Sequence, residues 1–99
     1  MNMQNLMAQA QKMQRDITKK KEEIDNTIFE GKSEWVIIKI NGKKELVSLS
    51  IIYNSDLSVD DKEILEDMIK IAYNDAYKKV EKEIEEKMGT YAGGLGGLF

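Results

Sequence analysis

The spacing of apolar residues changes twice along this 99-residue chain, and that change limits the fold more than any single motif does. From about Met3 to Ile24, apolar residues recur at intervals of three and four, which predicts an amphipathic helix. They alternate between residues 34 and 52, as in a half-buried strand, and the helical interval then returns. The sequence therefore predicts an α+β domain with the order α-β-β-β-α, in which two long helices flank a small antiparallel sheet.

The β-rich middle of the chain predicts three strands. Residues 27–31, TIFEG, form a short candidate strand that ends on glycine. The pair Asn41-Gly42 then separates EWVIIKI from KKELVSLSII, which predicts a hairpin with a type I′ turn. In the second arm three apolar residues alternate with serines and are expected to join the buried face of the sheet: Val47, Leu49 and Ile51.

The second helix is predicted to begin at Ser58 and to end just before Gly89. Ser58 and Asp61 have the spacing of a capping box, and Gly89 is suited to a C-terminal cap. The pair Asn74-Asp75 weakens the interior of this helix, so we expect it to form a hydrogen bond to another helix or to a strand.

The lengths of the elements predict a partner chain. At about 1.5 Å per residue the helices would be roughly 33 and 46 Å long, whereas a strand of typical length spans about 20 Å. Either the helices pack against each other beyond the sheet or a second chain covers them. We expect the Met/Leu/Ala stripe of the first helix to pack on the second helix, and we predict a homodimer. Its expected interface contains Trp35 and Ile37, which make the second face of the sheet partly apolar.

Composition excludes several classes of site. The chain has no Cys and no His, so disulfides, Cys-zinc sites and imidazole-based triads are absent. No apolar run reaches the ~18 residues of a membrane span, and no secretion signal opens the chain. The acidic residues between 56 and 67 are expected to cap a helix and to face solvent. We therefore predict a cytoplasmic protein that is not an enzyme, with no metal, no cofactor, no membrane contact and no small-molecule substrate.

Charge is unevenly distributed along the chain. The net charge of −3 argues against a protein that binds nucleic acid through bulk electrostatics. Residues 12–21, however, carry five cations and one anion, and Lys12, Arg15 and Lys19 share one helix face. Lysines recur over residues 78–87, with glutamates at i,i+4. Both groups could bind phosphates, and the alternative for each is a solvated helix flank.

Four segments in order resemble the YbaB/EbfC family: NLMAQAQKMQ, ING, DDKEILEDMI and AYNDAYKKVE. Members of that family are small bacterial nucleoid-associated DNA-binding proteins. The resemblance implies a homodimer joined through the sheets, with paired helices that project as arms and grip the duplex. The domain would comprise residues 1–88, followed by a flexible glycine-rich tail of residues 89–99. Trp35 and the tail depart from the family pattern.

These observations together predict a protein that binds duplex DNA with low sequence specificity and organises the chromosome or modulates gene expression. Its location would be the nucleoid. The alternative, which the net charge favours, is a protein–protein adaptor whose helical arms hold another protein. The predicted DNA-binding residues come from both helices: Lys12, Arg15, Lys19, Lys20, Lys78, Lys79, Lys82 and Lys87.

Overall fold

The structure is a computed structural model, and it describes residues 2–89, so the predicted tail beyond Gly89 lies outside the described residues. The predicted order α-β-β-β-α is confirmed. The elements are α1 (Met3–Asp25), β1 (Phe29–Lys32), β2 (Val36–Ile40), β3 (Leu46–Ile51), the 3₁₀ helix η1 (Val59–Asp61) and α2 (Lys62–Met88).

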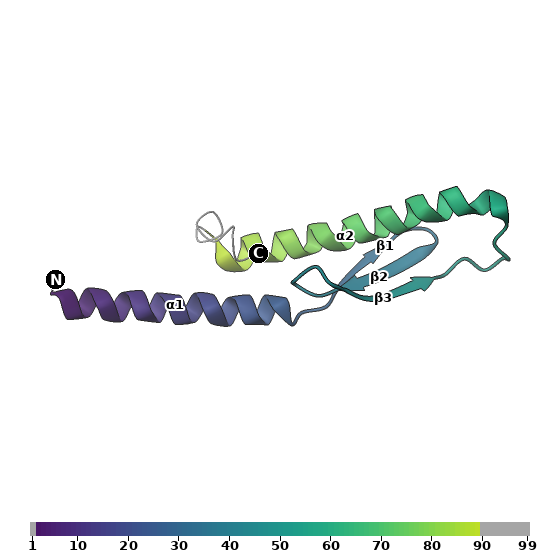
Figure 1. Cartoon of the computed structure of the whole chain (residues 1–99). Helices are drawn as coiled ribbons and strands as arrows, with labels where there is room; N and C mark the ends of the chain where they lie inside the picture. Colours follow the sequence, from purple (N-terminus) through teal and green to yellow (C-terminus); the bar gives the residue numbers. More distant parts are fainter. Residues whose placement is uncertain (1, 90–99) are drawn as a thin grey trace.

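The molecule is elongated, with principal extents of 70 × 19 × 17 Å. Its antiparallel sheet has the strand order β1-β2-β3 and lies at one end. Helix α2 covers one face of this sheet and then runs back beside the C-terminal part of α1 (Figure 1). The N-terminal part of α1 projects beyond the end of α2 as an arm, and we call it the α1 arm.

Small residues allow α2 to pack closely on β1. Ala72 and Ala76 are fully buried, and a Cβ added to Gly31 of β1 would lie 1.9 Å from the carbonyl oxygen of Ala72. A larger residue at any of these positions would force the helix off the sheet. The other buried apolar side chains come mainly from β2 and from the later turns of α2: Val36, Ile38, Ile40, Val80, Ile84 and Met88.

The predicted ends of α2 are confirmed with a small change at its start. A short 3₁₀ helix precedes α2, and the N–H of Ser58 donates to Oδ2 of Asp61 at 2.9 Å, as in a capping box. At the other end the N–H of Gly89 donates to the carbonyl of Glu85 at 3.0 Å, and Gly89 has a positive φ of 52°. Glycine adopts that conformation with little strain.

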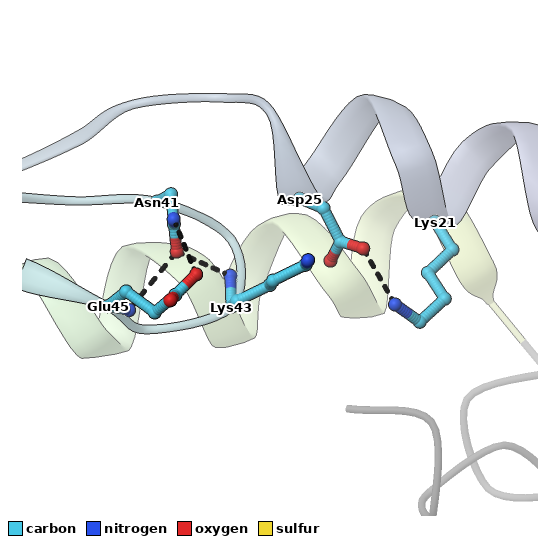
Figure 2. Close-up of polar contacts among 5 residues, drawn as sticks. All are labelled: Lys21, Asp25, Asn41, Lys43 and Glu45. Carbon is cyan, nitrogen blue, oxygen red and sulfur yellow. Dashed lines mark hydrogen bonds and ion pairs between the residues drawn. The ribbon is translucent and has the colours of Figure 1, made fainter.

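The hairpin forms at the predicted place, but the predicted type I′ turn is wrong. That turn needs positive φ at Asn41 and Gly42, whereas the positive φ in this loop belongs to Lys44, at 68°. Asn41 accepts three backbone N–H groups instead. Its carbonyl oxygen accepts that of Lys44 at 2.9 Å. Its Oδ1 accepts those of Lys43 at 2.9 Å and of Glu45 at 3.1 Å (Figure 2). Gly42 serves close packing, because a Cβ there would lie 2.0 Å from the carbonyl oxygen of Ile24.

The predicted burial of β3 is also wrong, because all of its residues are exposed. Leu49 and Ile51 pair with buried β2 residues and so lie on the face that carries α2. Helix α2, however, lies over β1 and β2. A bulge after Lys39 places Leu46, in place of Val47, opposite Ile40.

The apolar stripe of α1 is covered only toward its C-terminal end. Ile24 is fully buried and Ile17 packs against the core, since α2 runs beside this part of the helix. Residues nearer the N-terminus are 47–76% exposed: Met3, Leu6 and Met13. The expectation that the whole stripe packs on α2 is therefore wrong, because α2 ends too early. Over residues 2–89 no helix is both long and apolar enough to cross a membrane.

Candidate nucleic-acid interface

Three cations form an exposed row along α1, and we call this row the α1 basic face: Lys12, Arg15 and Lys19. Within residues 2–89 none of the three forms an ion pair. An open hollow on the same side of the helix is lined by Gln11, Gln14, Arg15, Thr18, Lys19 and Glu22. The face thus places cations that form no ion pair within residues 2–89 beside the amides of Gln11 and Gln14, with one carboxylate, Glu22, at its edge.

Helix geometry directs the α1 basic face away from the rest of the molecule. At about 100° per residue, Lys12, Arg15 and Lys19 fall on the side of α1 opposite to Ile17 and Ile24. Those two isoleucines contact the core, so the cations point to solvent. The predicted residue Lys20 falls beside the isoleucines and is half-buried.

The predicted α2 cation Lys79 is held by the sheet. Its Nζ donates to the carbonyl oxygen of Glu30 in β1 at 2.6 Å and lies 3.5 Å from Oδ2 of Asp75. Asp75 in turn accepts the backbone N–H of Lys32 at 3.0 Å, which confirms the expected hydrogen bond from the Asn74-Asp75 pair to a strand. Lys79 is therefore less available to a phosphate than an unpaired lysine would be.

The other predicted α2 cations differ in their availability. Two of them form ion pairs with glutamates one helical turn away. Nζ of Lys82 lies 3.9 Å from Oε1 of Glu86, and Nζ of Lys87 lies 3.5 Å from Oε1 of Glu83. Lys78 is exposed and forms no ion pair within residues 2–89. Exposed pairs of this kind contribute little free energy, so Lys78 and Lys82 remain accessible.

The structure does not bring the two predicted groups of cations together. Lys78 and Lys82 lie on the side of α2 opposite to the buried residue Val80, and the α1 basic face lies on the side of α1 that points away from α2. The helices themselves are in contact, with Lys87 Nζ 3.9 Å from Glu23 of α1. The two groups consequently face opposite sides of the helix pair, and a straight duplex would contact only one of them in each protomer.

The residues predicted for the dimer interface lie mainly against their own chain. The ring of Trp35 stacks on Tyr53 with centroids 4.2 Å apart, and Ile37 is half-buried. Their face of the sheet also carries Lys39, which pairs with Ser48 of β3. That face is polar beyond Trp35 and Ile37, as the sequence pattern predicts, and its role in dimerisation stays a prediction.

A second apolar surface lies between β3 and α2, and sequence analysis did not assign it to an interface. We call it the β3 groove, and it is lined by Ile38, Leu46, Leu49, Ile69, Lys70, Tyr73 and Asn74. Leu46 and Leu49 are 58% and 38% exposed. The alternation of β3 correctly placed Leu49 and Ile51 on one face. It could not show that a bulge brings Leu46 opposite Ile40 in place of Val47, or that α2 leaves this strand uncovered.

Lys44 fixes the hairpin to α2, and sequence analysis missed this contact. Its Nζ lies 2.8 Å from Glu81 and 4.7 Å from the centre of the Tyr77 ring, while its carbonyl accepts the hydroxyl of Tyr73 at 3.2 Å. The hydrogen bond to Glu81 raises the pKa of Lys44, and desolvation opposes part of that rise. The three α2 residues recur at intervals of four, which was the one signal available in the sequence.

Comparisons with known proteins agree on one family. The model of the YbaB/EbfC DNA-binding family matches residues 1–95. A nucleoid-associated protein of Lactococcus lactis subsp. cremoris is 44% identical over 98 residues, covering 96% of this chain and 97% of that protein. One from Chloroflexus aurantiacus is 41% identical over 101 residues and covers 100% of both. An uncharacterized Helicobacter pylori protein of known crystal structure superposes with a TM-score of 0.71 at 31% identity, covering 87% of this chain and 91% of that one.

Proposed function

Because this chain belongs to the YbaB/EbfC DNA-binding family, we propose that it binds duplex DNA through the α1 basic face with low sequence specificity. The observation that carries this proposal is the set of cations on the solvent side of α1 that form no ion pair within residues 2–89: Lys12, Arg15 and Lys19. Free cations bind phosphates and release counterions, and the neighbouring glutamine amides add hydrogen bonds without adding charge. Because phosphates are the same in every sequence, such a face discriminates little between sequences.

The proposed DNA-binding unit is a homodimer joined along β3. This strand is an edge of the sheet, all of its residues are exposed, and the β3 groove beside it is apolar. A second copy would extend the sheet through backbone hydrogen bonds and cover Leu46, Leu49 and Ile51. Such a dimer carries two basic faces, so we expect it to neutralise about four to six phosphates despite its net negative charge.

A dimer with two projecting arms is suited to a structural role on DNA. Two arms can hold one duplex or two neighbouring duplexes, and either mode changes the path or the packing of the chromosome. We propose that the protein organises the nucleoid in the cytoplasm and thereby modulates gene expression. The names of its relatives agree with a nucleoid location.

A DNA-binding assay with matched variants tests the proposal. The arm variant combines Lys12→Ala, Arg15→Ala and Lys19→Ala. The control variant removes the same charge from the sheet end through Lys39→Ala, Lys43→Ala and Lys62→Ala. Fluorescence anisotropy with two duplexes of unrelated sequence should show that the arm variant binds both at least about tenfold more weakly, while the control stays close to the parent. Equal loss in the two variants would show that overall charge, and not this face, governs binding.

A protein–protein adaptor is the second candidate, and the exposed apolar side of the α1 arm favours it. Met3 and Met7 are 76% and 59% exposed, and both are flexible side chains that suit a helical partner. If the adaptor function is correct, the arm variant should bind DNA no worse than the parent. Substitution of Met3 and Met7 by Gln should then abolish capture of the partner protein.

A further inference from the structure

The two edges of the sheet differ in how their backbone groups are satisfied. In an antiparallel pair, alternate residues exchange hydrogen bonds with the neighbouring strand, and the others direct their N–H and C=O groups outward. In β1 the outward residues are Glu30 and Lys32: the N–H of Ser33 donates to the carbonyl of Val36 at 2.8 Å, so the odd-numbered residues of this segment face β2. An edge with such free groups is a template for another strand.

Helix α2 occupies this edge with two side chains. Oδ2 of Asp75 accepts the N–H of Lys32 at 3.0 Å, and Nζ of Lys79 donates to the carbonyl oxygen of Glu30 at 2.6 Å. The spacing of the two elements makes both contacts possible at once. Residues two apart in a strand are separated by about 6.6 Å, and residues four apart in a helix by about 6 Å. Nζ of Lys79 also lies 3.5 Å from Oδ2 of Asp75, so the two side chains form an ion pair. We call Asp75 and Lys79, with their contacts to β1, the β1 clip.

No side chain of residues 2–89 covers the opposite edge in this way. The N–H of Ile52 donates to the carbonyl of Trp35 at 2.7 Å, so the even-numbered residues of this segment face β2. Leu49 and Ile51 therefore direct their backbone groups away from the sheet. Both side chains are exposed, at 38% and 47%. One edge is thus closed by charged side chains, and the other is open and flanked by apolar residues.

We infer that the β1 clip confines pairing between copies of this chain to β3, so that association ends at a closed dimer. A sheet with two free edges can add copies at both, which gives an open-ended array, whereas one self-complementary edge gives a closed pair. The side chains of Asp75 and Lys79 are 42% and 52% exposed, so their ion pair adds little to folding stability. Removing the clip therefore changes assembly more than it changes folding.

This inference rests on the proposed β3 dimer, and sedimentation velocity of the full chain tests both. The clip variant combines Asp75→Ala with Lys79→Ala. The control combines Asp67→Ala with Lys78→Ala, which removes the same charges from exposed α2 positions that form no ion pair within residues 2–89. We expect the parent and the control to sediment as dimers at every concentration. The average mass of the clip variant should rise at least about twofold above the dimer as concentration increases.

Each outcome of this experiment is decisive. If the parent sediments as a monomer, the proposed dimer fails, whatever the variants do. If the parent is a dimer and the clip variant, shown to be folded by circular dichroism, remains one, the inference is overturned. If the clip variant does not fold, the single variant Lys79→Ala takes its place. This variant exposes the carbonyl of Glu30, and the inference predicts that its average mass also rises above that of the dimer. Asp75→Asn retains an acceptor for the Lys32 N–H and should remain a dimer, and higher assemblies of this variant would contradict the role given to that hydrogen bond.

Discussion

At the sheet end of the molecule, helix α2 carries the same kind of apolar stripe as the α1 arm, but the two stripes differ in how far they are buried. In α2 the stripe is buried from Ala72 to Met88, and Met88 is 1% exposed. In the α1 arm Met13 is 47% exposed, although its spacing and chemistry are the same. The difference lies in what stands opposite: α2 faces the sheet and α1, whereas the arm faces no other helix or strand of residues 2–89. Periodicity therefore predicts a helix face, and tertiary contacts decide whether that face is core.

The two regions also differ in whether their cations have ion-pair or hydrogen-bond partners. At the sheet end Lys44 is held by Glu81 and the ring of Tyr77, and Lys79 is held by Asp75 and the carbonyl of Glu30. On the arm the cations have no such partners within residues 2–89. The tertiary contacts are thus concentrated at the sheet end, whereas the arm carries cations that no side chain of residues 2–89 holds. Substitutions at the sheet end should mainly change folding, and substitutions on the arm should mainly change binding.

The largest expected effect is at the contact between β1 and α2. Gly31→Ala places a methyl group 1.9 Å from the carbonyl oxygen of Ala72, and a backbone atom cannot move aside as a side chain can. We expect a loss of about 3 kcal/mol or more in the free energy of unfolding, measured by urea denaturation. An unfolding midpoint equal to that of the parent would show that α2 does not approach β1 this closely.

A charge on the exposed face of β3 should break the proposed dimer without breaking the fold. Leu49→Asp would bring a carboxylate into an apolar contact, and we expect the dimer dissociation constant to rise about a hundredfold. Ser50→Asp is the matched control, because its side chain lies on the other face of β3. Equal weakening by both substitutions, measured by sedimentation equilibrium, would remove the β3 groove from the interface.

A pair of identical substitutions compares the two stripes directly. Met88→Ala removes a buried side chain and should cost about 2 kcal/mol of unfolding free energy. Met13→Ala removes a largely exposed one and should leave thermal stability close to that of the parent. A comparable loss at Met13 would indicate that a second chain covers the arm.

The smallest expected effect concerns the contact that fixes the hairpin. Lys44→Met keeps the aliphatic stem but removes the ion pair to Glu81, which is half exposed, so the cost should be about 0.5 kcal/mol. The pKa of Lys44 is raised in the folded protein, so its contribution is fully present below the unfolded pKa of about 10.4. It should be lost as pH rises through the folded pKa. A difference between parent and variant that persists unchanged at strongly alkaline pH would contradict this assignment.

Local signals in the sequence were sufficient for the elements and insufficient for the contacts between them. Ser58 and Gly89 marked the ends of α2 because caps depend on neighbouring residues. The turn at Asn41-Gly42 was mispredicted because Gly42 meets the end of α1, which is distant in sequence. The spacing of Lys12, Arg15 and Lys19 in the sequence was sufficient to predict that they share one face of α1. The partners of Lys79 could not be predicted, because they depend on how far α2 runs along β1.

The central claim is that the α1 basic face neutralises DNA phosphates, and its most direct test is the salt dependence of binding. For the parent dimer, a plot of the logarithm of the binding constant against that of the salt concentration should have a slope of about −4 to −5, at roughly 0.9 per phosphate. The arm variant with Lys12, Arg15 and Lys19 replaced by Ala should give a slope close to zero. The same steep slope in both proteins, or no salt-sensitive binding by the parent, would contradict the claim.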